Sequence, residues 1–198
     1  MDLVVVLTVF GIVFLGELPD KTAVASLVLG ARYSPLPVLL GVAAAFAVHV
    51  AVATAAGTFV AALPQRPVEI ATSLLFLAGA ILLLRADPGK SAEEGESNAE
   101  RVTGERRWYA VSGASFGLVL VAEFGDLTQI LTATLAARYE QPLAVGVGAL
   151  LALVSVAALA VTLGRSLLRV VPLRRIQQLA AVVLVVLSVV TLIGAVRG

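Results

Sequence analysis

The chain has 198 residues, of which 60% are hydrophobic and only 14% are charged. A soluble domain carries about a quarter charged residues, so this composition indicates a membrane protein. The net charge of +1 excludes a strongly basic surface and argues against nucleic acid as a partner. The chain has no cysteine, which excludes disulfides, thiolate metal sites and a cysteine nucleophile.

Six stretches are long and apolar enough to cross a bilayer, which takes a helix of about 20 mostly apolar residues. In chain order they are 3–31, 36–63, 68–84, 108–137, 143–164 and 176–196. The first is interpreted as a retained span, because Met1-Asp2 lacks the basic region of a cleavable signal. The stretch 85–107 has six acids, five bases and no apolar periodicity, which predicts a mobile linker. The sequence therefore predicts an all-α integral membrane protein with six transmembrane helices.

The second half of the chain repeats the first. At an offset of 106 residues, Glu17-Leu18-Pro19-Asp20-Lys21-Thr22 aligns with Glu123-Phe124-Gly125-Asp126-Leu127-Thr128, and Ala31-Arg32-Tyr33 aligns with Ala137-Arg138-Tyr139. Each unit holds three predicted spans, an odd number, so the second unit must enter the membrane from the opposite face. This predicts two inverted three-helix repeats, 1–85 and 108–198, joined by a charged linker, 86–107. Such an arrangement is typical of secondary transporters.

Basic residues are distributed unevenly between the loops on the two sides of the predicted membrane domain. Ten fall on the side of the charged linker, and three fall on the side that holds both termini. Loops rich in arginine and lysine stay in the cytoplasm. The sequence therefore predicts a multi-pass protein of the plasma (inner) membrane, with the central loop cytoplasmic and both termini outside.

Each motif places two acids three residues apart inside a span, Glu17 with Asp20 and Glu123 with Asp126. That spacing puts each pair on one face of a helix. A charged residue at the bilayer centre costs about 3 kcal/mol even on the lenient insertion scale, so these carboxylates must point inward. Inverted symmetry brings the two motifs together near the midplane, and a cluster of four carboxylates suits a hard divalent cation.

The residues around these acids favour the same interpretation. Pro19 and Gly125 occupy equivalent positions and both weaken a helix, Pro19 by removing a hydrogen bond and Gly125 by permitting unusual dihedral angles. Carbonyls freed at membrane depth are tolerated where they line a cavity or bind a ligand. Thr22 and Thr128 are candidates for further oxygen ligands.

The two motifs resemble the E-x-G-D-[KR]-[ST] signatures of the Gdt-type family of calcium/manganese:proton antiporters, which has Golgi, thylakoid and bacterial manganese-exporting members. The resemblance covers essentially the whole chain. It implies metal or proton ligation by Glu17, Asp20, Glu123 and Asp126, with Thr22 and Thr128 in support. It also implies a divalent metal ion and protons as partners, and no prosthetic group. Pro19 replaces the first glycine and Leu127 the second basic residue, so this site is less symmetric than the family pattern.

Several other polar residues have open interpretations. Lys21 is either an internal counter-ion for the empty site or a base that snorkels to the surface. His49, in the middle of the second span, is either a core histidine with one hydrogen-bond partner or a ligand or proton relay. Gln129 and Thr132 continue the helix face beyond the second motif, where they either line an access path or bond across helices.

The hypothesis for function is a secondary active transporter, not an enzyme, that exchanges Mn²⁺ or Ca²⁺ for protons at a midplane site. Two alternatives stay open: an intramembrane aspartyl protease, which also needs two membrane carboxylates, and a non-transporting membrane scaffold. The protease reading predicts a G-x-G-D motif, which neither Leu18-Pro19-Asp20 nor Phe124-Gly125-Asp126 provides. Manganese and calcium accept similar oxygen shells, so the residues favour neither ion. Both a monomer and a homodimer are compatible with the repeat.

Overall fold

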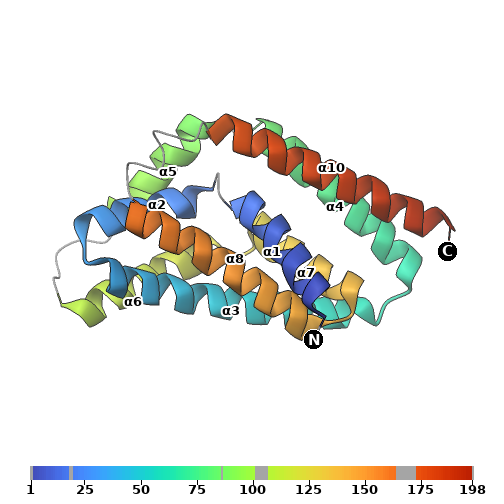
Figure 1. Cartoon of the computed structure of the whole chain (residues 1–198), viewed down its shortest axis with the longest axis horizontal. Helices are drawn as coiled ribbons and strands as arrows, with labels where there is room; N and C mark the ends of the chain where they lie inside the picture. Colours follow the sequence, from blue (N-terminus) through green and yellow to red (C-terminus); the bar gives the residue numbers. More distant parts are fainter. Residues whose placement is uncertain (1, 18–19, 86, 101–106, 164–172, 198) are drawn as a thin grey trace.

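The computed structural model describes all residues except 1, 18–19, 86, 101–106, 164–172 and 198, together with some helical side chains that include Lys21. Over the described residues the chain is helical and has no strand. The helices, shown in Figure 1, are α1 (Leu3–Glu17), α2 (Lys21–Arg32), α3 (Pro35–Ala61), α4 (Gln65–Arg85), α5 (Pro88–Glu100), α6 (Trp108–Ala122), α7 (Leu127–Tyr139), α8 (Pro142–Leu163) and α10 (Leu173–Arg197).

Among the described residues, three helices are each long and apolar enough to cross a membrane. They are α3, most of α8 and the segment Gln178–Val196 of α10. Two bent pairs meet the same condition when each pair is taken as one span: α1 with α2, bent by 76°, and α6 with α7, bent by 73°. The chain is therefore an all-α membrane protein with up to five such spans. The remaining predicted span, 68–84, lies within the 21-residue helix α4, and its crossing of the membrane stays a prediction.

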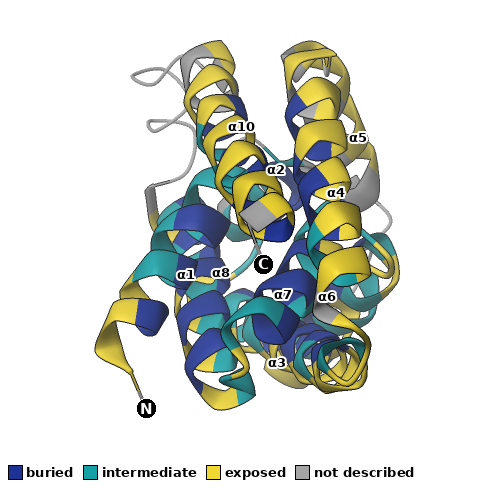
Figure 2. Ribbon diagram, turned by 90° about the vertical axis from the view of Figure 1, so that its right-hand side faces the viewer, coloured by how far each residue is buried: buried dark blue, intermediate teal, exposed yellow. Residues whose placement is uncertain are grey.

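Helices α4 and α10 pack against each other and present apolar side chains outward. Figure 2 shows that much of both helices is exposed. Leu74 and Leu77 of α4 and Val182 and Val186 of α10 are between 41% and 60% exposed. Across their shared face, the Ser73 hydroxyl donates to the Ser188 carbonyl oxygen at 3.0 Å, and the Ser188 hydroxyl donates to the Ser73 carbonyl oxygen at 2.8 Å. Hydrogen bonds of this kind are common between helices that pack against each other in a membrane.

The other membrane helices pack in a pattern that recurs between the two halves. Helix α1 packs on α8 as α6 packs on α3, and α2 packs on α8 as α7 packs on α3. A β-carbon added at Gly148 of α8 would lie 2.6 Å from the carbonyl oxygen of Val6 in α1. One added at Gly41 of α3 would meet the carbonyl oxygen of Ser112 in α6. Val6 and Ser112 are equivalent in the repeat, and Gly41 and Gly148 are equivalent to within one residue.

A second pair of glycine contacts has the same reciprocity. Gly30 of α2 lies against Val161 of α8, and Gly57 of α3 lies against Ala136 of α7. Gly30 and Ala136 stand at the repeat offset of 106 residues, and Gly57 and Val161 are within two residues of it. Only glycine allows helix backbones to approach this closely, because any side chain would have to occupy the space of the facing backbone. Each half therefore offers the same two packing surfaces to the other.

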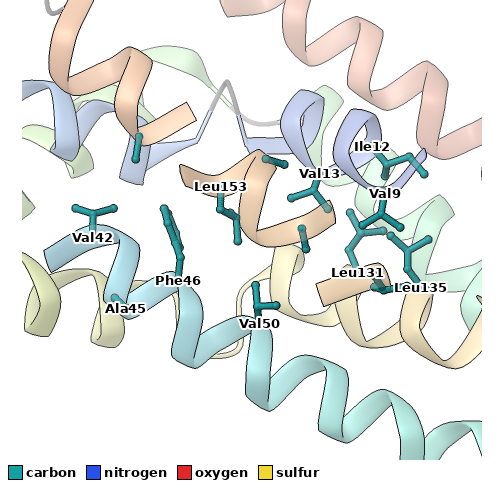
Figure 3. Close-up of a cluster of buried hydrophobic side chains, with 14 of the residues drawn as sticks. Val9, Ile12, Val13, Val42, Ala45, Phe46, Val50, Leu131, Leu135 and Leu153 are labelled. Carbon is teal, nitrogen blue, oxygen red and sulfur yellow. The ribbon is translucent and has the colours of Figure 1, made fainter. Parts of the chain in front are cut away.

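An apolar core lies between α1, α3, α7 and α8, next to the two bent pairs. Figure 3 shows Val13 of α1, Phe46 of α3, Leu131 and Leu135 of α7, and Leu153 of α8 gathered there. All five side chains are buried, with the exception of a few per cent of their surface. This packing holds α1 and α7, one helix from each bent pair, against the two unbroken helices α3 and α8.

The charged segment contains a helix, which the prediction of a mobile linker missed. Residues Pro88–Glu100 form α5, which packs along α2, and Ala99 is fully buried. Proline at a first helical position costs nothing, because its missing N–H would have no partner there, and alanine and glutamate favour helix. The prediction was wrong for these residues because hydrophobic periodicity does not detect a helix that buries small side chains.

Candidate metal centre

The candidate site lies where the two bent spans break. The first break separates α1 from α2, and the second separates α6 from α7. The sequence analysis predicted weakened helix at Pro19 and Gly125. Gly125 has a φ of +78°, in the left-handed region that glycine adopts without strain, so the second break is confirmed. Pro19 lies outside the described residues.

Each break has a glutamate before it and an aspartate after it. Glu17 is the last residue of α1, and Glu123 is the C-cap of α6. Asp20 and Asp126 are the N-caps of α2 and α7. The Asp20 carboxylate accepts the backbone N–H of Thr22 at 3.2 Å, which satisfies one of the free donors at the helix start. The positive ends of two helix dipoles therefore lie beside these aspartates, where they favour negative charge.

Each of the two motifs donates one hydrogen bond to the other. Thr128 of the second motif donates its hydroxyl to Oε2 of Glu17 at 2.8 Å. Thr22 of the first motif donates its hydroxyl to Oε1 of Glu123. Glu17 is 1% exposed and Glu123 is 4% exposed, so both carboxylates are removed from solvent. The threonines, predicted as additional ligands, act in this structure as donors that hold the glutamate of the opposite motif.

Three of the four predicted carboxylates converge. Carboxylate oxygens of Glu17, Asp20 and Glu123 all lie within 4.8 Å of one another. Oxygens on opposite sides of a calcium ion stand about 4.6–5.2 Å apart, because each Ca–O distance is about 2.3–2.6 Å. One hard cation can therefore contact all three. Among the described residues, Oε1 of Glu17 is buried without a hydrogen-bond partner, and a cation would satisfy it. Asp126 is not part of this group.

A pocket adjoins the cluster on the side of the second motif. Glu123 and Thr128 form part of its lining. Gln129 and Thr132, the residues predicted for an access path, also line it, together with His49. The pocket thus connects the carboxylate cluster with the polar face of α7 and with the middle of α3.

His49 lies beside the second motif, a proximity that the sequence analysis did not predict. Its Nδ1 is 3.3 Å from Nε2 of Gln129, and Gln129 also accepts the Gly125 N–H through Oε1 at 2.7 Å. Among the described residues, Nε2 of His49 is buried without a partner. The interpretation of His49 as a core histidine predicted one hydrogen-bond partner, and Gln129 is such a partner. No local pattern signals the contact, because the two residues lie 80 positions apart. Both roles left open for Lys21, an internal counter-ion or a base that snorkels to the surface, concern a side chain outside the described set.

Comparison with known proteins agrees with this geometry. The chain matches the family described as divalent cation/proton antiporter GDT1 over residues 5–91 and 111–198. A GDT1-like protein of Synechocystis sp. is 32% identical over 165 residues, which cover 78% of this chain and 80% of that protein. No solved structure matches the chain. The matched ranges include both acidic motifs. The chain therefore belongs to the GDT1 family of divalent cation/proton antiporters.

Proposed function

We propose that this chain is a secondary active transporter, not an enzyme, that exchanges Mn²⁺ or Ca²⁺ for protons at the acidic cluster. The convergence of Glu17, Asp20 and Glu123 within 4.8 Å carries the proposal. Their ligand atoms are all oxygens, which disfavours zinc and copper and suits manganese and calcium. The buried Oε1 of Glu17 gives the cation an oxygen for which the described residues offer no other partner.

Proton exchange follows from the spacing of the same carboxylates. At 4.8 Å, two unit charges repel by about 3.5 kcal/mol if the effective dielectric constant is 20. A bound divalent cation outweighs this repulsion, but a site that has released its cation does not keep three ionised carboxylates. One or two protons therefore bind as the metal leaves, and they are released when metal returns. The carboxylates titrate as a coupled group, so the transported proton belongs to no single residue.

The proposed motion is a rocking of two inverted three-helix repeats around the cluster. The reciprocal glycine contacts and the exchanged Glu–Thr hydrogen bonds support this, because both relate equivalent positions of the two halves. Asp20 belongs to the converging group and its equivalent, Asp126, does not. In the opposite conformation of the transport cycle, Asp126 takes the place of Asp20. We further propose a cytoplasmic central segment and outward termini in the plasma membrane, from the distribution of basic residues.

Transport by the purified protein in liposomes tests the proposal. With the membrane voltage clamped, an imposed pH gradient alone is expected to drive Mn²⁺ or Ca²⁺ uphill, and metal movement is expected to shift the lumenal pH in the opposite sense. A panel of divalent ions establishes the preference. Glu123→Gln is expected to abolish the flux, whereas Glu69→Gln, in α4 and outside the cluster, keeps it. Metal flux that ignores the pH gradient would make the protein a uniporter or channel.

A further inference from the structure

An apolar groove lies between α4 and the helices α3 and α7. Its volume is about 590 Å³, and small-molecule sites in proteins have about 300–1,000 Å³. Apart from Thr72 and Thr134, the residues that line it are apolar, with Ala71 from α4 and Ala133 from α7 among them. Water inside such a groove finds few hydrogen-bond partners. The groove therefore suits a hydrocarbon chain, which the membrane supplies.

A smaller pocket with a polar lining, of about 80 Å³, continues this groove. The two cavities share the residues Val60, Leu63, Val68 and Thr72. Ala61, the last residue of α3, and Arg138, in the last turn of α7, both line the polar pocket. Two candidate spans therefore end there, which places the polar pocket near the surface of the bilayer. The groove extends inward from it, because Leu75 of its lining lies in the middle of α4.

One base and two acids line the polar pocket: Arg138, Glu69 and Glu140. The guanidinium of Arg138 donates to the hydroxyl of Thr191 in α10. A β-carbon added at Gly194, on the same face of α10, would lie 3.6 Å from Oε1 of Glu69. The base and one acid thus lie against the same face of one helix. Over the part of the chain that the structure describes, Arg138 forms no ion pair with either acid. The pocket therefore offers both a positive and a negative group to a ligand.

We infer that the polar pocket and the groove together bind one molecule of phosphatidylethanolamine. The lipid phosphate accepts hydrogen bonds from Arg138, since a guanidinium matches the geometry of phosphate oxygens. The ammonium group of the lipid donates its N–H groups to the carboxylates of Glu69 and Glu140. An acyl chain of the lipid occupies the groove between α3, α4 and α7.

The lining also distinguishes ethanolamine from the other common headgroups. The quaternary ammonium of choline has no N–H to donate, and proteins recognise it by surrounding it with aromatic rings. No aromatic side chain of the described residues lines either cavity. A purely anionic headgroup, such as that of phosphatidylglycerol, satisfies Arg138 but meets the two carboxylates with like charge. Phosphatidylethanolamine matches the base and the acids at once.

A lipid bound here joins two parts of the protein. Helices α4 and α10 run side by side (Figure 1), and they supply Glu69 and Thr191 to the polar pocket. Helices α3 and α7 supply the facing side of the same cavities. The bound lipid is therefore expected to stabilise the packing of α4 and α10 on α3 and α7. The inference does not depend on the proposed exchange of metal for protons, because no residue of the acidic cluster lines either cavity.

Lipid binding is tested with the purified full chain in detergent, after its own lipids have been removed. Phospholipids with identical acyl chains and ethanolamine, choline or glycerol headgroups are added. Native mass spectrometry measures how many molecules bind, and circular dichroism follows thermal unfolding. Phosphatidylethanolamine is expected to bind as one molecule, to raise the unfolding temperature, and to bind about tenfold more tightly than phosphatidylcholine, the effect of one hydrogen bond between charged groups. Phosphoethanolamine, which has no acyl chains, is expected to leave the unfolding temperature unchanged.

Substitutions in the polar pocket test the headgroup contacts. Arg138→Gln is expected to lose most of the binding of phosphatidylethanolamine. Arg66→Gln is the matched control, because Arg66 is an exposed base of α4 that lines neither cavity. The double variant Glu69→Gln with Glu140→Gln is expected to bind phosphatidylethanolamine and phosphatidylcholine equally. Glu69→Gln alone leaves Glu140 as a partner for the ammonium group.

A substitution in the groove tests the acyl-chain contact independently. Ala71→Phe places a ring in the groove and is expected to weaken the binding of all three lipids. Leu74→Phe, on the same helix but outside the groove, is expected to bind them as the wild type does. Every variant must first keep the wild-type circular dichroism without lipid, so that a lost response to lipid is not a loss of fold. Equal binding of the ethanolamine and choline lipids to the wild type, or tighter binding of phosphatidylglycerol, would overturn the inference. Binding that survives both Arg138→Gln and Ala71→Phe would also overturn it.

Discussion

Glu17→Gln should make the metal-free protein more stable while removing its response to metal. Glu17 is buried, and its carboxylate lies within 4.8 Å of carboxylate oxygens of Asp20 and Glu123. The amide keeps an oxygen that can accept from Thr128 and places an NH₂ group beside the two remaining acids. The substitution therefore removes a repulsive charge at almost constant shape.

The size of the effect follows from proton binding. Glu17 takes part in two of the three repulsive pairs, each at least about 3.5 kcal/mol at an effective dielectric constant of 20. On the proposed mechanism, the wild-type protein relieves this repulsion by keeping protons that the unfolded chain has already lost. A folded state that holds one extra proton loses about 1.4 kcal/mol of stability for each unit by which the pH rises. Glu17→Gln reduces that loss, so its advantage over the wild type grows with pH.

Thermal unfolding in detergent, followed by the far-ultraviolet circular dichroism of the helices, measures both effects. In chelator, the variant is expected to match the wild type in mild acid and to exceed it at alkaline pH. On addition of Mn²⁺ or Ca²⁺ at a hundred times the dissociation constant, the wild type gains about 2.7 kcal/mol and the variant gains little. Glu69→Gln is the control and is expected to show neither effect. A variant that is less stable than the wild type in chelator at high pH would refute the proposed repulsion.

Three further predictions concern packing, the helix break and topology. Gly148→Ala places a β-carbon 2.6 Å from a backbone oxygen and is expected to cost about 1–3 kcal/mol in unfolding experiments, whereas Gly113→Ala, with nothing within 4 Å, costs nothing. Gly125→Ala forces a side chain into the left-handed region at a cost of about 1–2 kcal/mol, and a variant as stable as the wild type would contradict the break. Reporter fusions after residue 95 are expected to report cytoplasm and fusions at Gly198 the outside; a cytoplasmic C-terminus would show that the orientation or the span number is wrong.

The membrane class and the positions of the helix breaks were predictable because they depend on local composition. Long apolar stretches admit few structures in lipid, and a glycine between two acids is a weak point in any helix. Helix α5 was not predicted, because its sequence contains no large apolar residue and its buried residue, Ala99, is small. Its stability depends on packing along α2, a tertiary contact that no window of sequence contains.

The residue types of the candidate site were predictable from the sequence, but the contacts between these residues were not. The four motif acids follow from their spacing and from the cost of charge in a membrane, and carboxylate oxygens of three of them lie within 4.8 Å of one another. That each threonine donates to the glutamate of the other motif depends on how the halves face each other. The contact of His49 with Gln129 likewise depends on the crossing of α3 and α7. Asp126 lies outside the group, which the proposed transport cycle attributes to the conformation that the protein occupies.

The threonine hydroxyl of each motif donates to the glutamate of the other motif. This arrangement constrains how a protein of this kind arises. A single unit would hold a glutamate and a threonine that cannot serve each other, so under the proposed inverted repeat it would work only as two copies inserted in opposite directions. Dual insertion requires a near-equal number of basic residues on both sides of the unit. Under the proposed topology, joining two copies through a charged segment such as 85–107, with its five bases, would fix one orientation for each copy and end that requirement. Each copy would then be free to differ from the other, as it does where His49 of α3 stands opposite Ser155 of α8 in the repeat.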